Sequence, residues 1–274
     1  MSAGPSTEPG TDPGPAPTLV PASVLAMMDL VAQSDSVELK LTVPASAYRV
    51  GARALEIDPV AAQIRQVYFF DTPDLALDRS GVVVRARRIQ GRDADSTVKL
   101  RPVVPDDLPA DVRRSPQLTV ELDAMPGGYV CSASMRHRVP PDAVLPAVTG
   151  RQPLHGLFSK EQRRFLAAHA PQGLEIDDLA VLGPILVLKQ RLEPAGFSRR
   201  LVVELWTYPD GARVVELSTK CAPGEAVAVA LETRRFLTSK GVPLGGDQQT
   251  KTRTALEFFA AELAAETGSA GAPA

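Results

Sequence analysis

The sequence predicts an α+β protein built mainly from an antiparallel β-sheet. Eight segments alternate apolar and polar residues with the period of two that an extended strand produces. Only three segments show a helical pattern; one falls between the fifth and sixth strands, and two follow the last strand. Runs of strands and helices without a regular βαβ alternation are typical of the α+β class.

The first strand is expected at 36–43, SVELKLTV, where every second residue is aliphatic and the intervening ones include Glu38 and Lys40. Pro-Asp-Gly turn chemistry in TYPDGA predicts a hairpin between the last two strands. The other strands are expected at 65–70, 81–88, 97–103, 117–123, 186–192, 199–206 and 213–220.

Helix signals are fewer than strand signals. Helices are expected at 159–170, 224–241 and 249–266. The first opens with the capping-box pair Ser159 and Gln162, and the second ends on Gly241, a residue favoured after a helix. The basic segment MRHRVPPD, 135–142, is broken by proline and is expected to be a loop.

Composition limits the domain organisation. Residues 1–33, rich in Pro, Gly and Ser at their start, are expected to form a disordered or weakly helical tail. Residues 34–262 should form one domain, and 263–274 a second disordered tail. The N-terminus lacks a basic region before its apolar stretch, which argues against a secretory signal.

Charge and cysteine content indicate a cytoplasmic protein that binds neither nucleic acid nor membrane. The chain has 30 basic and 32 acidic residues, without the basic excess typical of nucleic-acid binding. No apolar run is long enough to span a bilayer. Two cysteines without zinc-ligand spacing are expected to be reduced and structural.

Charged residues fall on one face of most predicted strands. The cations on these faces are Lys40, Arg85, Arg87, Lys99, Arg101, Lys189, Arg191, Arg200 and Lys220. The anions are Glu38, Glu121, Asp123, Glu204 and Glu216. A solvated face is the ordinary explanation for any single strand. Pairs of like charge on one strand, such as Arg85 with Arg87, repel each other unless they jointly bind a ligand of opposite sign.

A sheet closed into a barrel would direct these faces into its lumen. Unpaired charges removed from water are costly, so a cationic lumen is expected to bind a polyanion. Arginine and lysine favour phosphate oxygens, and carboxylates bind divalent cations that bridge phosphates. A triphosphate with Mg²⁺ or Mn²⁺ would satisfy both sets of side chains.

Four segments make the sequence resemble the CYTH superfamily, the triphosphate tunnel metalloenzymes. They are YFFDTPDLALDRSGVVVRARR, TVKLRP, YPDGARVVELSTK and QQTKTRTALEF, the last of which contains Lys251. The resemblance covers roughly residues 34–260. It implies a closed, antiparallel, eight-stranded barrel with a charged tunnel and helices packed outside. The oligomeric state, including a homodimer, stays open.

The resemblance further implies divalent-metal-dependent hydrolysis of a triphosphate, with these roles. Substrate binding falls to Arg85, Arg87, Lys99, Arg101, Lys189, Arg191 and Lys220. Metal binding falls to Glu38, Glu204 and Glu216, with Glu121 and Asp123 as further candidates. Catalytic roles fall to Lys40, Lys251 and Glu121. Possible substrates are inorganic triphosphate, thiamine triphosphate and nucleoside triphosphates, all small molecules.

Two positions depart from the family pattern. The N-terminal Glu-x-Glu-x-Lys motif has Ser36 in place of its first glutamate, and the late Glu-x-Glu motif has Ser218 in place of its second. Each lost carboxylate weakens a hard-cation site. Two alternatives therefore stay open: cyclisation of ATP to cyclic AMP, and a protein that binds triphosphate or polyphosphate without turnover.

Overall fold

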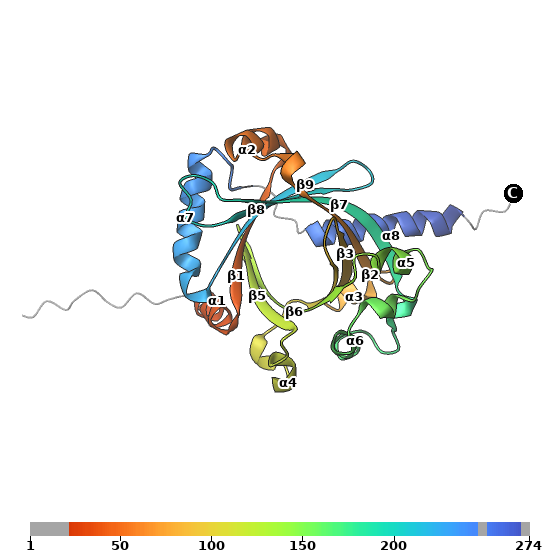
Figure 1. Cartoon of the computed structure of the whole chain (residues 1–274). Helices are drawn as coiled ribbons and strands as arrows, with labels where there is room; N and C mark the ends of the chain where they lie inside the picture. The colour runs from red at the N-terminus through yellow and green to blue at the C-terminus, as the bar shows by residue number, and fades with distance from the viewer. Residues whose placement is uncertain (1–21, 246–250, 270–274) are drawn as a thin grey trace, which may run out of the picture.

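The computed structural model of the chain describes residues 22–245 and 251–269 and contains a closed β-barrel with helices around it (Figure 1). Strand neighbours follow the order β1-β5-β6-β4-β3-β2-β7-β8-β9, and β9 returns to β1. The strands are β1 Ser36–Val43, β2 Gln63–Asp71, β3 Val82–Ile89, β4 Ala94–Leu100, β5 Leu118–Met125, β6 Gly128–Val139, β7 Ala180–Leu192, β8 Leu201–Thr207 and β9 Arg213–Cys221.

The barrel has nine strands, so the prediction of eight was wrong. The ninth is β6, and the segment 135–142 that was expected to be a loop supplies its last residues. β6 pairs along its length with β5 and β4, for example Met135 with Leu118 and Ser134 with Lys99. Small and polar residues give β6 little alternation of its own, and pairing on both sides determines its conformation.

The barrel is mixed rather than fully antiparallel. β1 runs parallel to β5, with Glu38 opposite Asp123, and antiparallel to β9, with Glu38 opposite Lys220. A closed ring with an odd number of strands cannot alternate direction throughout, so at least one neighbouring pair must be parallel. The unexpected ninth strand and the parallel pair therefore have the same origin.

The helices lie outside the barrel wall or against its end. They are α1 Ala22–Gln33, α2 Tyr48–Ala54, α3 Ala76–Arg79, α4 Ala110–Arg113, α5 Val144–Val148, α6 Lys160–Ala167, α7 Ala226–Ser239 and α8 Lys251–Ser269. The capping box of α6 is confirmed, because Ser159 and Gln162 each accept the other's backbone N–H. The predicted domain end at residue 262 falls inside α8, and residues 1–21 and 270–274 of the predicted tails lie outside the described residues.

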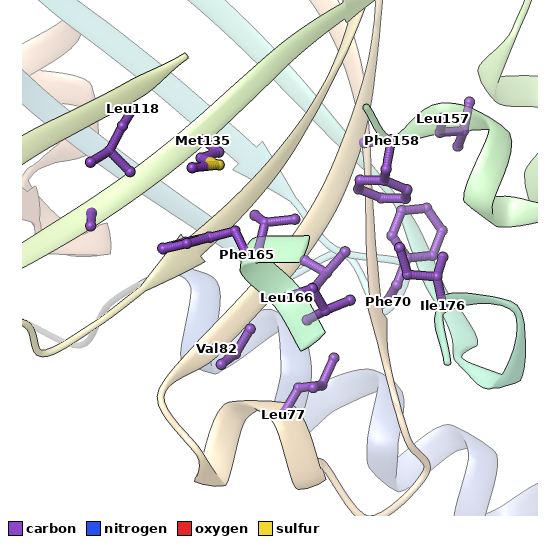
Figure 2. Packing of buried hydrophobic residues seen from close by; sticks show 14 of the residues in the cluster. Phe70, Leu77, Val82, Leu118, Met135, Leu157, Phe158, Phe165, Leu166 and Ile176 are labelled. Carbon is purple, nitrogen blue, oxygen red and sulfur yellow. The ribbon is translucent and has the colours of Figure 1, made fainter. Parts of the chain in front are cut away.

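The hydrophobic core lies between the outer face of the barrel and the helices. Phe70 of β2 meets Phe158 edge to face, with ring centroids 5.9 Å apart, and Phe165 and Leu166 of α6 pack into the same cluster (Figure 2). Outward residues such as Ala86 are fully buried in this layer. The apolar faces thus point outward into a core, and the opposite faces point into the barrel.

A second apolar cluster fixes α8 against the barrel. Leu256 and Phe259 of α8 are buried with Phe69 and Trp206, near the carboxyl ends of β2 and β8. The hydroxyl of Tyr208 donates to the Lys251 carbonyl oxygen at 3.0 Å. This packing holds the first residue of α8 at the barrel interior. No described helix is long and apolar enough to cross a membrane.

Candidate functional site

The barrel encloses a polar cavity of about 360 Å³. All nine strands and the start of α8 contribute to its wall. The predicted residues that line it are Glu38, Lys40, Arg85, Arg87, Lys99, Arg101, Glu121, Asp123, Lys189, Arg191, Glu204, Glu216, Lys220 and Lys251. The charged faces therefore converge in the lumen, as the sequence predicted.

Arg200 is the exception among the predicted inward cations. It precedes β8, its side chain is exposed, and it pairs with Glu193 at 3.2 Å. Alternation assigns a residue to a face only while the strand continues, and β8 begins at Leu201. The inward placement of Arg200 was therefore wrong.

Three carboxylates meet on one side of the tunnel. One oxygen from each of Glu38, Glu121 and Asp123 lies within 4.8 Å of the others. The parallel pairing of β1 with β5 sets Glu38 beside Asp123. Lys40 bridges these two residues, with its Nζ 3.2 Å from Glu38 and 2.9 Å from Asp123.

Polar neighbours surround this acidic group. The Nζ of Lys99 lies 3.3 Å from Asp123, and Lys220 contacts Glu121. The hydroxyl of Ser36 donates to Glu121 Oε2 at 3.3 Å. Hard oxygen donors at this spacing are the ligands that Mg²⁺ and Mn²⁺ prefer, so the residues present fit a divalent ion.

The three carboxylates differ in acidity. Burial acts to raise the pKa of Glu38, but the Lys40 ammonium, a hydrogen bond with Glu121 and the Lys251 charge together outweigh it and lower that pKa to about 2. Burial is likewise outweighed at Asp123, where Lys40 and Lys99 lower the pKa. Burial and the charge of Glu38 raise the pKa of Glu121. Glu121 is therefore the member of the group that most readily accepts a proton.

The predicted metal ligands Glu38, Glu204 and Glu216 are not brought together. Glu216 lies opposite Thr42 of β1, four residues from Glu38, which is about 13 Å along a strand. Glu204 and Glu216 are register partners on β8 and β9, and both contact the Lys251 Nζ at 2.5 Å. The tunnel thus holds two separate carboxylate groups.

Three charged residues of the site escaped sequence analysis: Arg65, Asp95 and Arg136. The Asp95 carboxylate accepts hydrogen bonds from Arg87 and from Arg136, whose side chain is 61% exposed. Arg65 and Arg136 line the cavity. Asp95 has the parity of Lys99 but precedes the segment expected as a strand, and Arg136 lies on the unrecognised β6.

Several cations of the tunnel have no ionic partner among the described residues. The buried Nε of Arg85 has no hydrogen-bond partner. Arg101 and Arg191 likewise form no side-chain hydrogen bond or ion pair within residues 22–245 and 251–269. Burial and the neighbouring Arg87 lower the pKa of Arg85 to about 10. These three guanidiniums are available to an anionic ligand.

No protein-family model and no curated protein matches the sequence. Among solved structures, one similar chain is HpAC1 from Hippeastrum, a proposed adenylyl cyclase described as having a dominant triphosphatase activity. It has 17% sequence identity and a TM-score of 0.58, over 80% of this chain and 94% of that one. A proposed adenylate cyclase from Bacillus halodurans has 13% identity and a TM-score of 0.56, over 80% and 97%. The chain therefore shares the overall fold of these two solved structures, with its strands in a closed barrel.

Proposed function

We propose that the chain binds a small molecule bearing a triphosphate in its tunnel and hydrolyses it with a divalent metal ion. The observation that carries the proposal is that the guanidiniums of Arg85, Arg101 and Arg191 line the cavity and form no ion pair with any residue in the described part of the chain. Eleven cationic and five acidic side chains line that cavity. Partly desolvated cations in such excess favour a ligand with several negative charges.

The acidic group supports metal dependence. Glu38, Glu121 and Asp123 would hold the ion, which supplies charge neutralisation for the phosphates when bound. Lys40 and Lys99 lie beside these carboxylates and would contact phosphate oxygens there. Positioning and charge stabilisation of this kind account for most of the catalysis of phosphoryl transfer.

The pKa shifts support a division of roles among the predicted catalytic residues. Burial and Glu38 raise the pKa of Glu121, which suits a carboxylate that takes a proton from an attacking water. Burial acts to lower the pKa of Lys40, but Asp123 and Glu38 outweigh it and raise that pKa. Burial also acts to lower the pKa of Lys251, but the charges of Glu204 and Glu216 outweigh it and raise that pKa. Both lysines are then permanent cations rather than proton acceptors.

The neighbours support this chemistry and favour one alternative. HpAC1 is described as having a dominant triphosphatase activity, which supports hydrolysis. Both similar structures are of proposed adenylyl or adenylate cyclases, which favours cyclisation of ATP as the second candidate. The same cationic tunnel would bind the phosphates in either reaction.

A substrate panel tests the proposal. Inorganic triphosphate, thiamine triphosphate and ATP are each incubated with Mg²⁺ or Mn²⁺, phosphate release is measured, and cyclic AMP is sought by mass spectrometry. Phosphate release that is lost in Arg85→Gln and kept in Arg200→Gln is the expected result. Arg200 is a matched control because it lies outside the tunnel. Calorimetric binding without turnover would identify a binding protein, and absence of binding would overturn the proposal.

A further inference from the structure

An apolar groove lies outside the tunnel, between α7 and the barrel wall (Figure 1). Its volume is about 470 Å³, which is within the range of small-molecule sites in proteins. Leu39 and Leu41 of β1 and Leu217 of β9 line it on the barrel side, and Ala230 and Thr233 of α7 line it on the helix side. The three leucines alternate with the tunnel residues of their strands, so the groove is on the outer face of the wall.

The sizes of the side chains along α7 explain the groove. The helix packs on the barrel through Val229 in its first half and through Phe236 and Leu237 near its end, and all three are buried. Between these contacts it carries Ala230 and Thr233, which are too short to fill the space. Val229 also belongs to a different apolar cluster from Phe236 and Leu237. The groove therefore coincides with a break between two parts of the hydrophobic core.

The space beneath α7 is narrow. Val229 and Phe236 are seven residues apart, which corresponds to about 10 Å along a helix. A helix with its side chains is about 10–12 Å wide, so it could not pass beneath α7 between these two contacts. A single unbranched hydrocarbon chain is narrower and fits the dimension.

Two polar groups of α7 distinguish one side of the groove. The Oγ1 atom of Thr233 is buried and has no hydrogen-bond partner among the described residues. Arg234 lines the groove and is exposed, and it forms no side-chain hydrogen bond or ion pair within the part of the chain that the structure describes. None of the described residues that line the groove is acidic. A guanidinium without a partner beside an apolar surface favours an anion with an apolar body.

We propose that this groove binds a fatty acid. Its carboxylate pairs with Arg234 and accepts a hydrogen bond from the Thr233 hydroxyl, while its chain packs on Leu39, Leu41 and Leu217. Ligands with many polar groups, such as sugars, are disfavoured because the apolar lining would leave those groups without partners. The site does not depend on the proposed function, since no residue of α7 is among those that line the tunnel.

Fatty acids of increasing length provide the test. The full chain is titrated calorimetrically with octanoate, decanoate and dodecanoate, each below its micellar concentration. One molecule should bind per chain, and the affinity should rise about fourfold for each added methylene, as expected when one more CH₂ is buried. Decanol, which has the same chain without the charge, should bind about tenfold less tightly than decanoate.

Two variants of α7 separate the contributions of shape and charge. Thr233→Leu should abolish decanoate binding and raise Tm, because leucine fills the groove and removes a buried hydroxyl without a partner. Arg234→Gln, at an exposed position, should weaken decanoate binding about tenfold and leave the affinity for decanol unchanged. Arg235→Gln is the matched control, because Arg235 is an exposed neighbour that does not line the groove, and it should bind decanoate like the wild type.

Four results would overturn the proposal. They are no binding of any of the three acids, equal decanoate affinities in the wild type and Thr233→Leu, equal affinities in the wild type and Arg234→Gln, and loss of decanoate binding in Arg85→Gln, which would place the ligand in the tunnel. A wild-type dimer that dissociates in Thr233→Leu in analytical ultracentrifugation would identify a second copy of the chain as the occupant instead. None of these measurements uses a triphosphate, so failure of the proposed function would be seen separately.

Discussion

The guanidinium of Arg87 holds the carboxylate of Asp95 by two hydrogen bonds, with Nε 2.8 Å from Oδ1 and Nη2 3.0 Å from Oδ2. Asp95 is 1% exposed, and Arg136 shares its Oδ2. One buried carboxylate thus orients two arginines at the tunnel wall. A bidentate pair of this kind fixes geometry as well as charge.

Asp95→Asn should lower the free energy of unfolding by about 3 kcal/mol, since it leaves the Arg87 charge uncompensated. Bound inorganic triphosphate should recover part of the loss, so the ligand-induced rise in Tm should exceed that of the wild type. Urea unfolding and differential scanning fluorimetry measure the two effects.

The matched control is Asp93→Asn, because Asp93 pairs with Arg138 at 3.9 Å and both side chains are exposed. It should change stability by less than about 0.5 kcal/mol. Equal losses in the two variants would contradict the assigned role of Asp95.

Arg85→Gln should raise the stability of the ligand-free protein by about 1 kcal/mol. The substitution removes a buried cation that has a partnerless Nε and the like charge of Arg87 nearby. It should also abolish the stabilisation by inorganic triphosphate. Arg200→Gln, on the outer surface, should show neither effect in urea unfolding, and a ligand-free Arg85→Gln less stable than the wild type would refute the prediction.

Glu38 should contribute to stability in a pH-dependent way. Its folded pKa, about 2, is below the ordinary glutamate value of 4.5, because Lys40, a hydrogen bond with Glu121 and Lys251 together outweigh the effect of burial. A lowered acid pKa stabilises the folded state above pH 4.5, and this contribution is lost as the pH falls from 4.5 to about 2. Urea unfolding at a series of pH values should therefore give Glu38→Gln a free energy of unfolding well below that of the wild type at pH 7. Near pH 2 the two free energies should be close.

The control for that series is Glu193→Gln, since Glu193 is exposed and pairs only at the surface with Arg200. The free energy of unfolding of Glu193→Gln should differ little from that of the wild type at every pH. If the free energies of unfolding of Glu38→Gln and the wild type differed by the same amount at pH 7 and pH 2.5, the Glu38 charge would not be the cause of the lost stability.

Ser36→Glu should strengthen metal binding by about tenfold, which corresponds to about 1.4 kcal/mol. The serine hydroxyl contacts Glu121, so a longer acidic side chain there would add a fourth carboxylate to the acidic group. Without metal, repulsion between like charges should lower the stability of the variant. Ser36→Gln, of the same size and without charge, is the control, and equal Mn²⁺ affinities for the two variants in calorimetry would rule out the effect.

Residue alternation predicted which side chains face the tunnel but could not predict their positions along the tunnel axis. Glu38 and Glu216 share the interior, yet strand register places them far apart along β1 and β9. Register depends on the pairing of whole strands, which the period of two does not encode. Alternation therefore placed Glu38, Glu204 and Glu216 on the interior face, while register divides them between two carboxylate groups.

Site residues near strand ends, or on strands with little alternation, could not be predicted from the sequence. Asp95 lies just before the alternating segment of β4, and Arg136 lies on β6, where small residues hide the pattern. Their places in the barrel depend on neighbouring strands rather than on local sequence. The capping box of α6 and the β8–β9 hairpin were predictable because turn and cap chemistry is local.

The position of β1 between β5 and β9 has a consequence for how the chain folds. Ser36 pairs with Glu121, and Val37 pairs with Cys221, so β1 must meet partners synthesised long after it. Contacts this distant along the chain slow folding. During translation, the barrel cannot close before residue 221 has left the ribosome, and until then the charged lining stays hydrated.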